Sequence, residues 1–153
     1  MTGTYERPPF RLVAPPAPGS EAFWTGGRSG ELLIMRCHTC ARFFHPPAPV
    51  CWRCRSRDVA PEAVSGKGRI AAFTVNRQAW IPGFDPPYIV VMVELADEPD
   101  VRLISNLVGV SIGDTGVAAQ IGMPVEVCFE EWTPLGGEET VWVPLFRPAE
   151  AAP

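Results

Sequence analysis

The sequence predicts a mainly β protein in which a short N-terminal helix and a small metal-binding module precede a five-stranded barrel. Two observations carry this prediction. Two Cys-x-x-Cys pairs stand close together in the first part of the chain, and short apolar segments separated by turn residues fill the second part. With 153 residues and a hydrophobic fraction of 46%, the chain suffices for one ordinary domain or for a small module beside a modest one.

The two cysteine pairs are Cys37 with Cys40 and, ten residues further on, Cys51 with Cys54. Two tight turns at this spacing can place four thiolates around one tetrahedral ion, so the pattern predicts a closed structural Zn2+ site. Two disulfides or a redox-active pair are the alternatives. Redox exchange needs only one dithiol, and disulfides would imply export, of which the first residues give no sign.

Three further side chains could bear on chemistry. His38, inside the first pair, could replace a cysteine as ligand, although a histidine in such a turn is more often exposed. His45 is the other histidine and also lies beside the cysteines. Cys128 is interpreted as a small half-buried side chain, because no nearby residue supplies the base that a nucleophile needs. We therefore expect no catalysis by the isolated chain.

The N-terminal part divides into an arm and a helix. Residues 1–19 contain five prolines and are predicted to form a disordered or extended arm. Residues 20–30 form a short helical segment, in which Ser20 suits the N-cap and two glycines end the helix. Such a short helix is not stable alone, so Phe23 and Trp24 are expected to pack on the metal-binding module, a zinc ribbon, or on another subunit.

The remaining boundaries follow from turn residues. Residues 31–65 are predicted to form the zinc ribbon, with strands at 31–35 and 43–44. Its end is marked by the turn cluster Ser65-Gly66-Lys67-Gly68. Residues 66–148 then form the barrel, and residues 149–153 form a tail.

Within the barrel, five β segments are predicted, at residues 69–79, 88–95, 101–108, 125–132 and 141–146. One helical turn is expected at residues 117–121, before Gly122. Five strands with a helical turn between the third and the fourth is the order of an OB-fold barrel. A small sandwich would fit the periodicity nearly as well.

Charge is unevenly distributed along the chain. Residues 28–69 carry eight basic and three acidic side chains, a net charge of +5, whereas residues 70–153 carry three basic and twelve acidic side chains, a net charge of −9. A basic metal-binding module is therefore joined to an acidic body. A solvated surface without a further role is the alternative explanation of this pattern.

With these elements placed, the chain resembles a known family, a rubredoxin-like zinc ribbon followed by an OB-fold, long catalogued as a domain of unknown function. The resemblance covers roughly residues 20–148 and keeps the motif order throughout. The residues that carry it are Phe23-Trp24, Gly30-Glu31-Leu32, Arg36-Cys37-x-x-Cys40, Pro46-Pro47-x-Pro49-x-Cys51-x-x-Cys54, Ser65-Gly66-x-Gly68, Thr74-Val75, Pro87-Tyr88, Leu107-Val108-Gly109, Ile121-Gly122-Met123-Pro124-Val125 and Pro144-x-Phe146-x-Pro148. Ala41 and Trp52 depart from it, because they stand where the family often has Gly and Pro.

The resemblance implies a non-catalytic accessory subunit that binds a thiolase-superfamily enzyme of the thiolase, acyltransferase or retro-aldolase type. In such assemblies the thiolase-like subunit carries the catalytic residues, and the ribbon and OB subunit helps to form or stabilise the acyl-CoA site. Steroid side-chain breakdown is among the implied settings. A hetero-oligomer with a structural Zn2+ is therefore expected.

The ribbon's positive charge suits the phosphates of coenzyme A. The candidate CoA-binding residues are Arg36, Arg42, Arg53, Arg55 and Lys67, with Trp52 or Trp80 available to stack on adenine. The candidate partner-interface residues are the aromatic side chains Phe23, Trp24, Phe84 and Tyr88. Packing within the chain is the alternative role of these aromatic groups.

A single-stranded nucleic-acid-binding protein is the alternative function, because zinc ribbons and OB-folds often serve that purpose. The net charge of −9 on the barrel region should repel a polyanion, which makes nucleic acid an unlikely partner. No apolar run approaches the ~20 residues that span a bilayer, so no membrane contact and a cytoplasmic location are expected.

Overall fold

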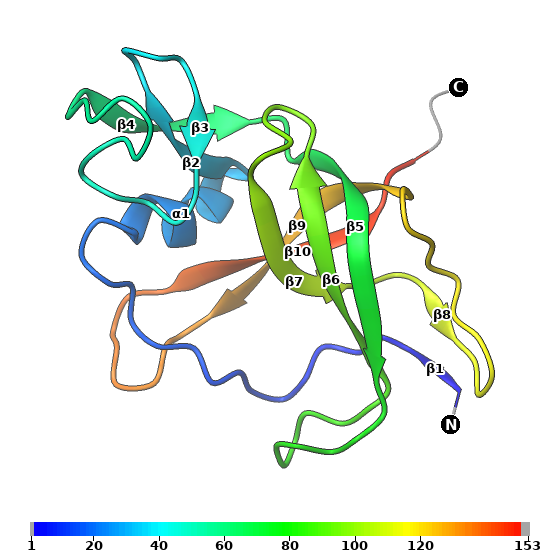
Figure 1. Ribbon diagram of the computed structural model, residues 1–153. Coiled ribbons are helices and arrows are strands. Elements are labelled where there is room, and N and C mark those ends of the chain that lie inside the picture. The colour runs from blue at the N-terminus through cyan, green and yellow to red at the C-terminus, as the bar shows by residue number, and fades with distance from the viewer. Residues whose placement is uncertain (1, 151–153) are drawn as a thin grey trace.

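The computed structural model describes residues 2–150, and Figure 1 shows a zinc-ribbon sheet beside a β-barrel. The elements, in chain order, are β1 (Gly3–Thr4), α1 (Glu21–Thr25), the 3-10 helix η1 (Gly26–Ser29), β2 (Leu32–Cys37), β3 (Phe43–Phe44), β4 (Val59–Val64), β5 (Lys67–Asn76), β6 (Tyr88–Leu95), β7 (Arg102–Leu107), β8 (Ser111–Ile112), β9 (Pro124–Trp132) and β10 (Val141–Pro148). The prediction of a mainly β protein is confirmed.

The five long strands of the second half form a closed barrel in the order β10-β7-β6-β5-β9. Neighbouring strands are antiparallel except β10 and β7, which meet in parallel where Phe146 faces Leu107. Residues alternate between the barrel interior and its outer side, as on β6, where Ile89, Val91 and Val93 are buried. The expected OB-fold barrel is confirmed, and the sandwich is not.

The helical turn that the sequence predicted at residues 117–121 is wrong. Val117 instead forms an isolated antiparallel bridge to Ile112, and the chain turns at residues 121–122. A segment of five residues cannot offset the cost of nucleating a helix. The segment is stabilised more by closing this loop than by forming a single helical turn. In the loop, the amide of Ala118 donates to the carbonyl of Ser111 at 3.1 Å.

The ribbon contains one strand that the sequence did not predict. Strand β4 pairs with the whole length of β2, from Leu32 opposite Val64 to Cys37 opposite Val59, so that the sheet order is β3-β2-β4. Pro61 weakens any strand signal in this segment, because proline cannot donate to a ladder. An edge strand tolerates it, since only one side is paired.

Ribbon and barrel share one hydrophobic core. Leu32, Ile34 and Val64 of the ribbon sheet lie in the same buried cluster as the barrel interior. A second, smaller cluster contains Phe44 and the buried cysteines Cys37 and Cys51. The ribbon is therefore fixed to the barrel at one end and depends on its cysteines at the other.

Helices α1 and η1 lie against the outer side of the barrel. At Gly27 the backbone of η1 lies directly against side chains of β9 and β10. A Cβ at this position would lie 2.4 Å from the Cβ of Trp142 and 2.5 Å from Cδ1 of Phe129. Only glycine allows the 3-10 helix to sit this near β9 and β10. Phe23 packs against the main core from the same side.

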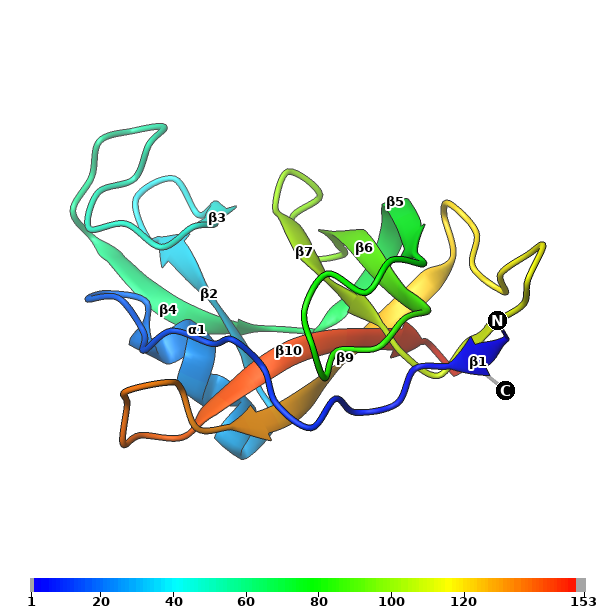
Figure 2. The same ribbon diagram turned by 90° about the horizontal axis from the view of Figure 1, so that it is seen from below.

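The proline-rich arm is extended and bound to the barrel. Figure 2 shows it running from α1 along one side of the barrel to β1. Gly3 and Thr4 pair with Ile112 and Ser111 of β8, and the amide of Leu135 donates to the carbonyl of Val13 at 3.0 Å. Within residues 2–150, no helix has the length and apolar character that crossing a bilayer requires.

Candidate functional site

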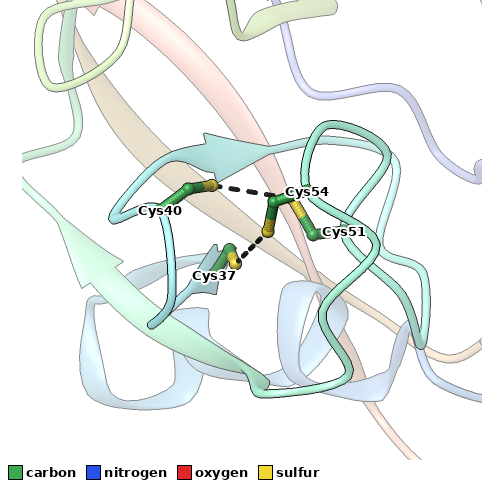
Figure 3. A group of neighbouring side chains, drawn as sticks. All are labelled: Cys37, Cys40, Cys51 and Cys54. Carbon is green, nitrogen blue, oxygen red and sulfur yellow. Dashed lines mark hydrogen bonds between the residues drawn. The ribbon is translucent and has the colours of Figure 1, made fainter.

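Each Cys-x-x-Cys pair together with the turn that follows it forms a knuckle, the first at residues 37–42 and the second at residues 51–56. The four cysteines of the two knuckles converge on one point. Their Sγ atoms all lie within 4.8 Å of one another, and those of Cys37 and Cys54 are 3.5 Å apart, those of Cys40 and Cys51 3.7 Å apart (Figure 3). A tetrahedral zinc ion with bonds of ~2.3 Å requires sulfur atoms ~3.8 Å apart. The donor set and its spacing therefore fit Zn2+. None of the described cysteines forms a disulfide.

The two knuckles repeat the same backbone geometry. The amide of Cys37 donates to the carbonyl of Arg42, and that of Cys51 donates to the carbonyl of Ser56, each at 2.9 Å. The residue after each second cysteine has a positive φ, 60° at Ala41 and 63° at Arg55. This conformation explains why glycine suits the position of Ala41.

Backbone amides stabilise thiolate at the first cysteine of each knuckle. Hydrogen bonds from the amides of Cys40 and Thr39 lower the pKa of Cys37. Those from Cys54 and Arg53 lower the pKa of Cys51 to about 6. Amides directed at sulfur are what a metal-binding thiolate needs.

Cys54 has the opposite shift. The amide of Ser56 lowers its pKa, but burial and hydrogen bonds to the other three thiols together raise the pKa to about 12. Four neighbouring sulfurs cannot all be anionic without a cation between them. A bound Zn2+ supplies that positive charge, and four thiolates leave no coordination position for water, so the site is structural.

Two other candidates lie outside this site. Both ring nitrogens of His38 face carboxylates, Nδ1 at 3.1 Å from Asp58 and Nε2 at 2.9 Å from Glu62, so His38 is not a fifth candidate ligand. Burial raises the pKa of the Cys128 thiol on β9, which disfavours its thiolate form. Within residues 2–150, the four knuckle cysteines are the only cluster suited to a metal ion.

The structure separates the candidate CoA-binding arginines into two groups. Arg36 is bound to Glu62 at 2.7 Å and stacks over Phe43. Arg42 reaches Asp100 at 2.7 Å and Glu98 at 3.4 Å in the loop between β6 and β7, and thereby joins the ribbon to the barrel. These two guanidinium groups already have carboxylate partners within the chain.

The second group lies open to solvent. Arg53 and Arg55 are exposed on the second knuckle beside Trp52, whose exposed fraction is 63%. Lys67 is exposed at the start of β5, and Trp80 lies beyond its end, in the loop at the far end of the barrel (Figure 1). A strand of 10 residues spans ~33 Å, so the structure does not bring Trp80 to the arginines.

The candidate partner-interface side chains gather at one place. Trp24, Phe84 and Tyr88 line a cavity of about 530 Å3 between α1, the arm and the β5–β6 loop. Phe84 and Tyr88 meet edge to face with centroids 4.5 Å apart. Phe23 supports Trp24 from behind in a similar contact at 5.1 Å.

Sequence reasoning missed the arm, which forms a wall of this cavity. Arg11 and Leu12 line it, and Leu12 is 62% exposed. Two further exposed apolar side chains, Ile81 and Leu135, lie next to the arm. The apolar residues Phe10, Leu12 and Val13, which surround Arg11 between two proline pairs, are the sequence signal that could have indicated this role.

Arg11 anchors the arm through a largely buried polar network. Its Nε donates to Glu130 at 2.9 Å and Nη1 donates to Oδ1 of Asn106 at 3.2 Å, while Nη2 donates to the hydroxyl of Tyr5. Burial raises the pKa of Glu130, but the hydrogen bonds from Arg11 and Tyr5 outweigh burial and hold it below its usual value. Burial and the bond to Glu130 raise the pKa of Tyr5.

Comparison with known proteins assigns both halves of the chain. Residues 24–60 match the family described as ChsH2, rubredoxin-like zinc ribbon domain, and residues 61–130 match ChsH2, C-terminal OB-fold domain. The chain is similar to a protein named Ltp2-ChsH2(DUF35) aldolase, with a TM-score of 0.71 and 33% identity over 89% of this chain and 98% of that chain. A DUF35 protein of unknown function from Sulfolobus solfataricus, 14% identical with a TM-score of 0.50 over 72% of this chain and 78% of that chain, shares the fold.

Two curated relatives are longer. A probable enoyl-CoA hydratase alpha subunit from Thermomonospora curvata is 33% identical over 95% of this chain and 43% of its own length. The 3-oxo-4,17-pregnadiene-20-carboxyl-CoA hydratase alpha subunit from Mycobacterium tuberculosis is 33% identical over 72% of this chain and 34% of its own length. The chain thus spans less than half of these relatives. Its ribbon, barrel and cysteine site show that this protein belongs to the ChsH2 (DUF35) family of zinc-ribbon and OB-fold proteins.

Proposed function

We propose that this chain is a non-catalytic accessory subunit that binds a thiolase-superfamily enzyme and helps to form or stabilise its acyl-CoA site. One observation carries the proposal. The chain covers 98% of a 33% identical chain in a protein named as an Ltp2-ChsH2 aldolase, so the similarity extends over the whole of that unit. The names of the curated relatives, both alpha subunits of CoA-ester hydratases, support an acyl-CoA setting.

The metal chemistry supports an accessory role. A hydrolytic zinc keeps one coordination position open for water, whereas four thiolates close the shell. Both nitrogens of His38 are occupied by carboxylates, and burial disfavours the thiolate of Cys128. We therefore assign the chemical step to the partner enzyme.

Charge supports a division of the CoA contacts. Arg36 and Arg42 hold the ribbon together and to the barrel, so we assign the phosphate contacts of CoA to the exposed Arg53, Arg55 and Lys67. Trp52, on the same knuckle, would stack on adenine. The acidic barrel and the family assignment disfavour the nucleic-acid alternative.

The partner would contact the side of the barrel that carries the arm. Leu12, Ile81 and Leu135 are exposed apolar side chains there, around the aromatic groups Trp24, Phe84 and Tyr88. Apolar side chains grouped in this way mark protein interfaces. We propose a hetero-oligomer in the cytoplasm, where thiols stay reduced and clustered cysteines such as these four serve to bind metal.

Co-expression with the thiolase-superfamily protein of the same organism tests this function. We expect both chains to elute as one complex, and we expect the complex to cleave or condense an acyl-CoA faster than the partner alone. Arg53→Gln combined with Arg55→Gln should raise the KM for the acyl-CoA in a salt-dependent way. Arg28→Gln, a change at another exposed arginine, is the matched control. Co-purification of RNA or DNA in place of the enzyme would contradict the proposal.

A further inference from the structure

The cavity beneath the arm has the dimensions and lining of a small-molecule site. Its volume of about 530 Å3 lies within the ~300–1,000 Å3 typical of such sites. The arm, α1, the β5–β6 loop and β10 each supply part of its wall, and the lining is mainly apolar. A neighbouring cavity of about 310 Å3 shares Arg11, Trp24, Asn106 and Val143 with it.

Three of the polar side chains that line the cavity, Arg11, Trp24 and Tyr88, have hydrogen-bond donors without a partner in the described part of the chain, whereas Ser20 and Asn106 are already paired within it. Arg11 has five N–H groups, of which three donate to Glu130, Asn106 and Tyr5, so that two have no partner among residues 2–150. In the same part of the chain, neither the indole N–H of Trp24 nor the hydroxyl of Tyr88 has a protein partner, and both residues line the cavity. A ligand that accepts hydrogen bonds would suit these donors.

The charge at the end of the cavity is already balanced. Glu130 lies 2.9 Å from Nε of Arg11, and both side chains are nearly buried, with exposed fractions of 13% and 12%. A ligand carboxylate would therefore meet a second carboxylate beside the same guanidinium, and it would lose its hydration among apolar side chains. An uncharged acceptor avoids both costs.

We propose that this cavity binds an uncharged, largely apolar molecule that carries a carbonyl oxygen, with the carbonyl directed at the free donors of Arg11 and Trp24. The apolar body of the ligand lies between the arm and the aromatic pair Phe84 and Tyr88. All the lining residues belong to this chain, so the site can be tested without the proposed partner enzyme, which would contact the same side of the barrel.

Titration of the purified zinc-loaded chain with 2-nonanone and with nonanoate at neutral pH tests the site. These probes have the same chain length and differ in charge at the oxygen-bearing end. Calorimetry should show saturable binding of 2-nonanone to one site, with nonanoate at least about tenfold weaker. Equal affinity for the two probes, or no saturable binding of the ketone, would overturn the proposal.

Substitutions in the lining test whether 2-nonanone binds in this cavity. Val143→Phe fills the cavity from β10 and should weaken 2-nonanone binding at least about tenfold. Ile121→Phe, at an exposed aliphatic residue that lines neither cavity, should leave the affinity unchanged. Trp24→Phe removes the indole N–H and should weaken binding about fivefold. If Val143→Phe does not fold, Ala14→Phe fills the same cavity from the exposed arm, and retained affinity in the folded variant would refute the site.

Discussion

Nε of Arg11 lies 2.9 Å from Oε2 of Glu130, although 119 residues separate the two side chains in the sequence. Their ion pair, together with the hydrogen bond from Tyr5 to the same carboxylate at 2.8 Å, fixes the arm to β9. The arm in turn forms a wall of the 530 Å3 cavity. This contact is therefore one of those that hold the wall of the cavity in place, beside the pairing of β1 with β8 and the hydrogen bond from Leu135 to Val13.

Glu130→Gln should loosen the arm without unfolding the barrel, because it removes the charge that pairs with Arg11. A hydrogen bond to a charged group contributes about 1.5–3 kcal/mol. The amide of Leu135, which donates to Val13 on the arm, should then exchange with deuterium about 10- to 150-fold faster. Glu139→Gln on the exposed β9–β10 turn is the control and should leave this rate unchanged.

Acid should also release the arm. The pKa of Glu130 in the folded protein lies below its ordinary value of 4.5, so its pairing stabilises the bound arm fully above that value and is lost as pH falls through the folded pKa. The indole N–H of Trp132, which donates to Glu130 at 3.0 Å, reports this step by NMR. The resonance should move only below pH ~4.5 and should stay constant in Glu130→Gln. A transition near neutral pH would contradict this assignment.

Ala41→Gly should stabilise the protein by about 1 kcal/mol, because Ala41 has a φ of 60° that glycine adopts without strain. Chemical denaturation of the zinc-loaded protein measures the change. Ala60→Gly within strand β4 is the matched control, and it should lower the stability by about 0.5–1 kcal/mol because glycine weakens a strand. Destabilisation by Ala41→Gly would show that the knuckle does not have this backbone conformation.

Removal of the metal should unfold the cysteine end of the ribbon first. Zinc binding contributes on the order of 10 kcal/mol to the folding of small modules, and the cluster around Cys37, Cys51 and Phe44 contains few other apolar groups. Cys51→Ser should reduce the zinc content from about one per chain to none, and should lower the solubility and the melting temperature. Cys128→Ser should retain the metal. Elemental analysis and thermal unfolding measure both effects.

Local patterns of the sequence were enough for the metal site and for the barrel. The spacing of Cys37, Cys40, Cys51 and Cys54 predicts convergence, because each pair makes its own tight turn and only one further contact must form. The barrel strands were predictable because each is a short β-rich segment bounded by turn residues, although alternation was visible only at residues 69–79 and 125–132. Strand β4 was missed because Pro61 obscures the pattern, and residues 117–121 formed no helix because a bridge to Ile112 holds the loop.

The sequence by itself determined the four sulfur ligands, the five barrel strands and the basic charge of the ribbon. Only the tertiary structure decided which charged groups are free. It paired Arg42 with Asp100 and Arg11 with Glu130, whereas it left Arg53 and Arg55 in solvent. Ion pairs and cavity walls are made by residues far apart in the chain, and no local spacing encodes which of them will meet.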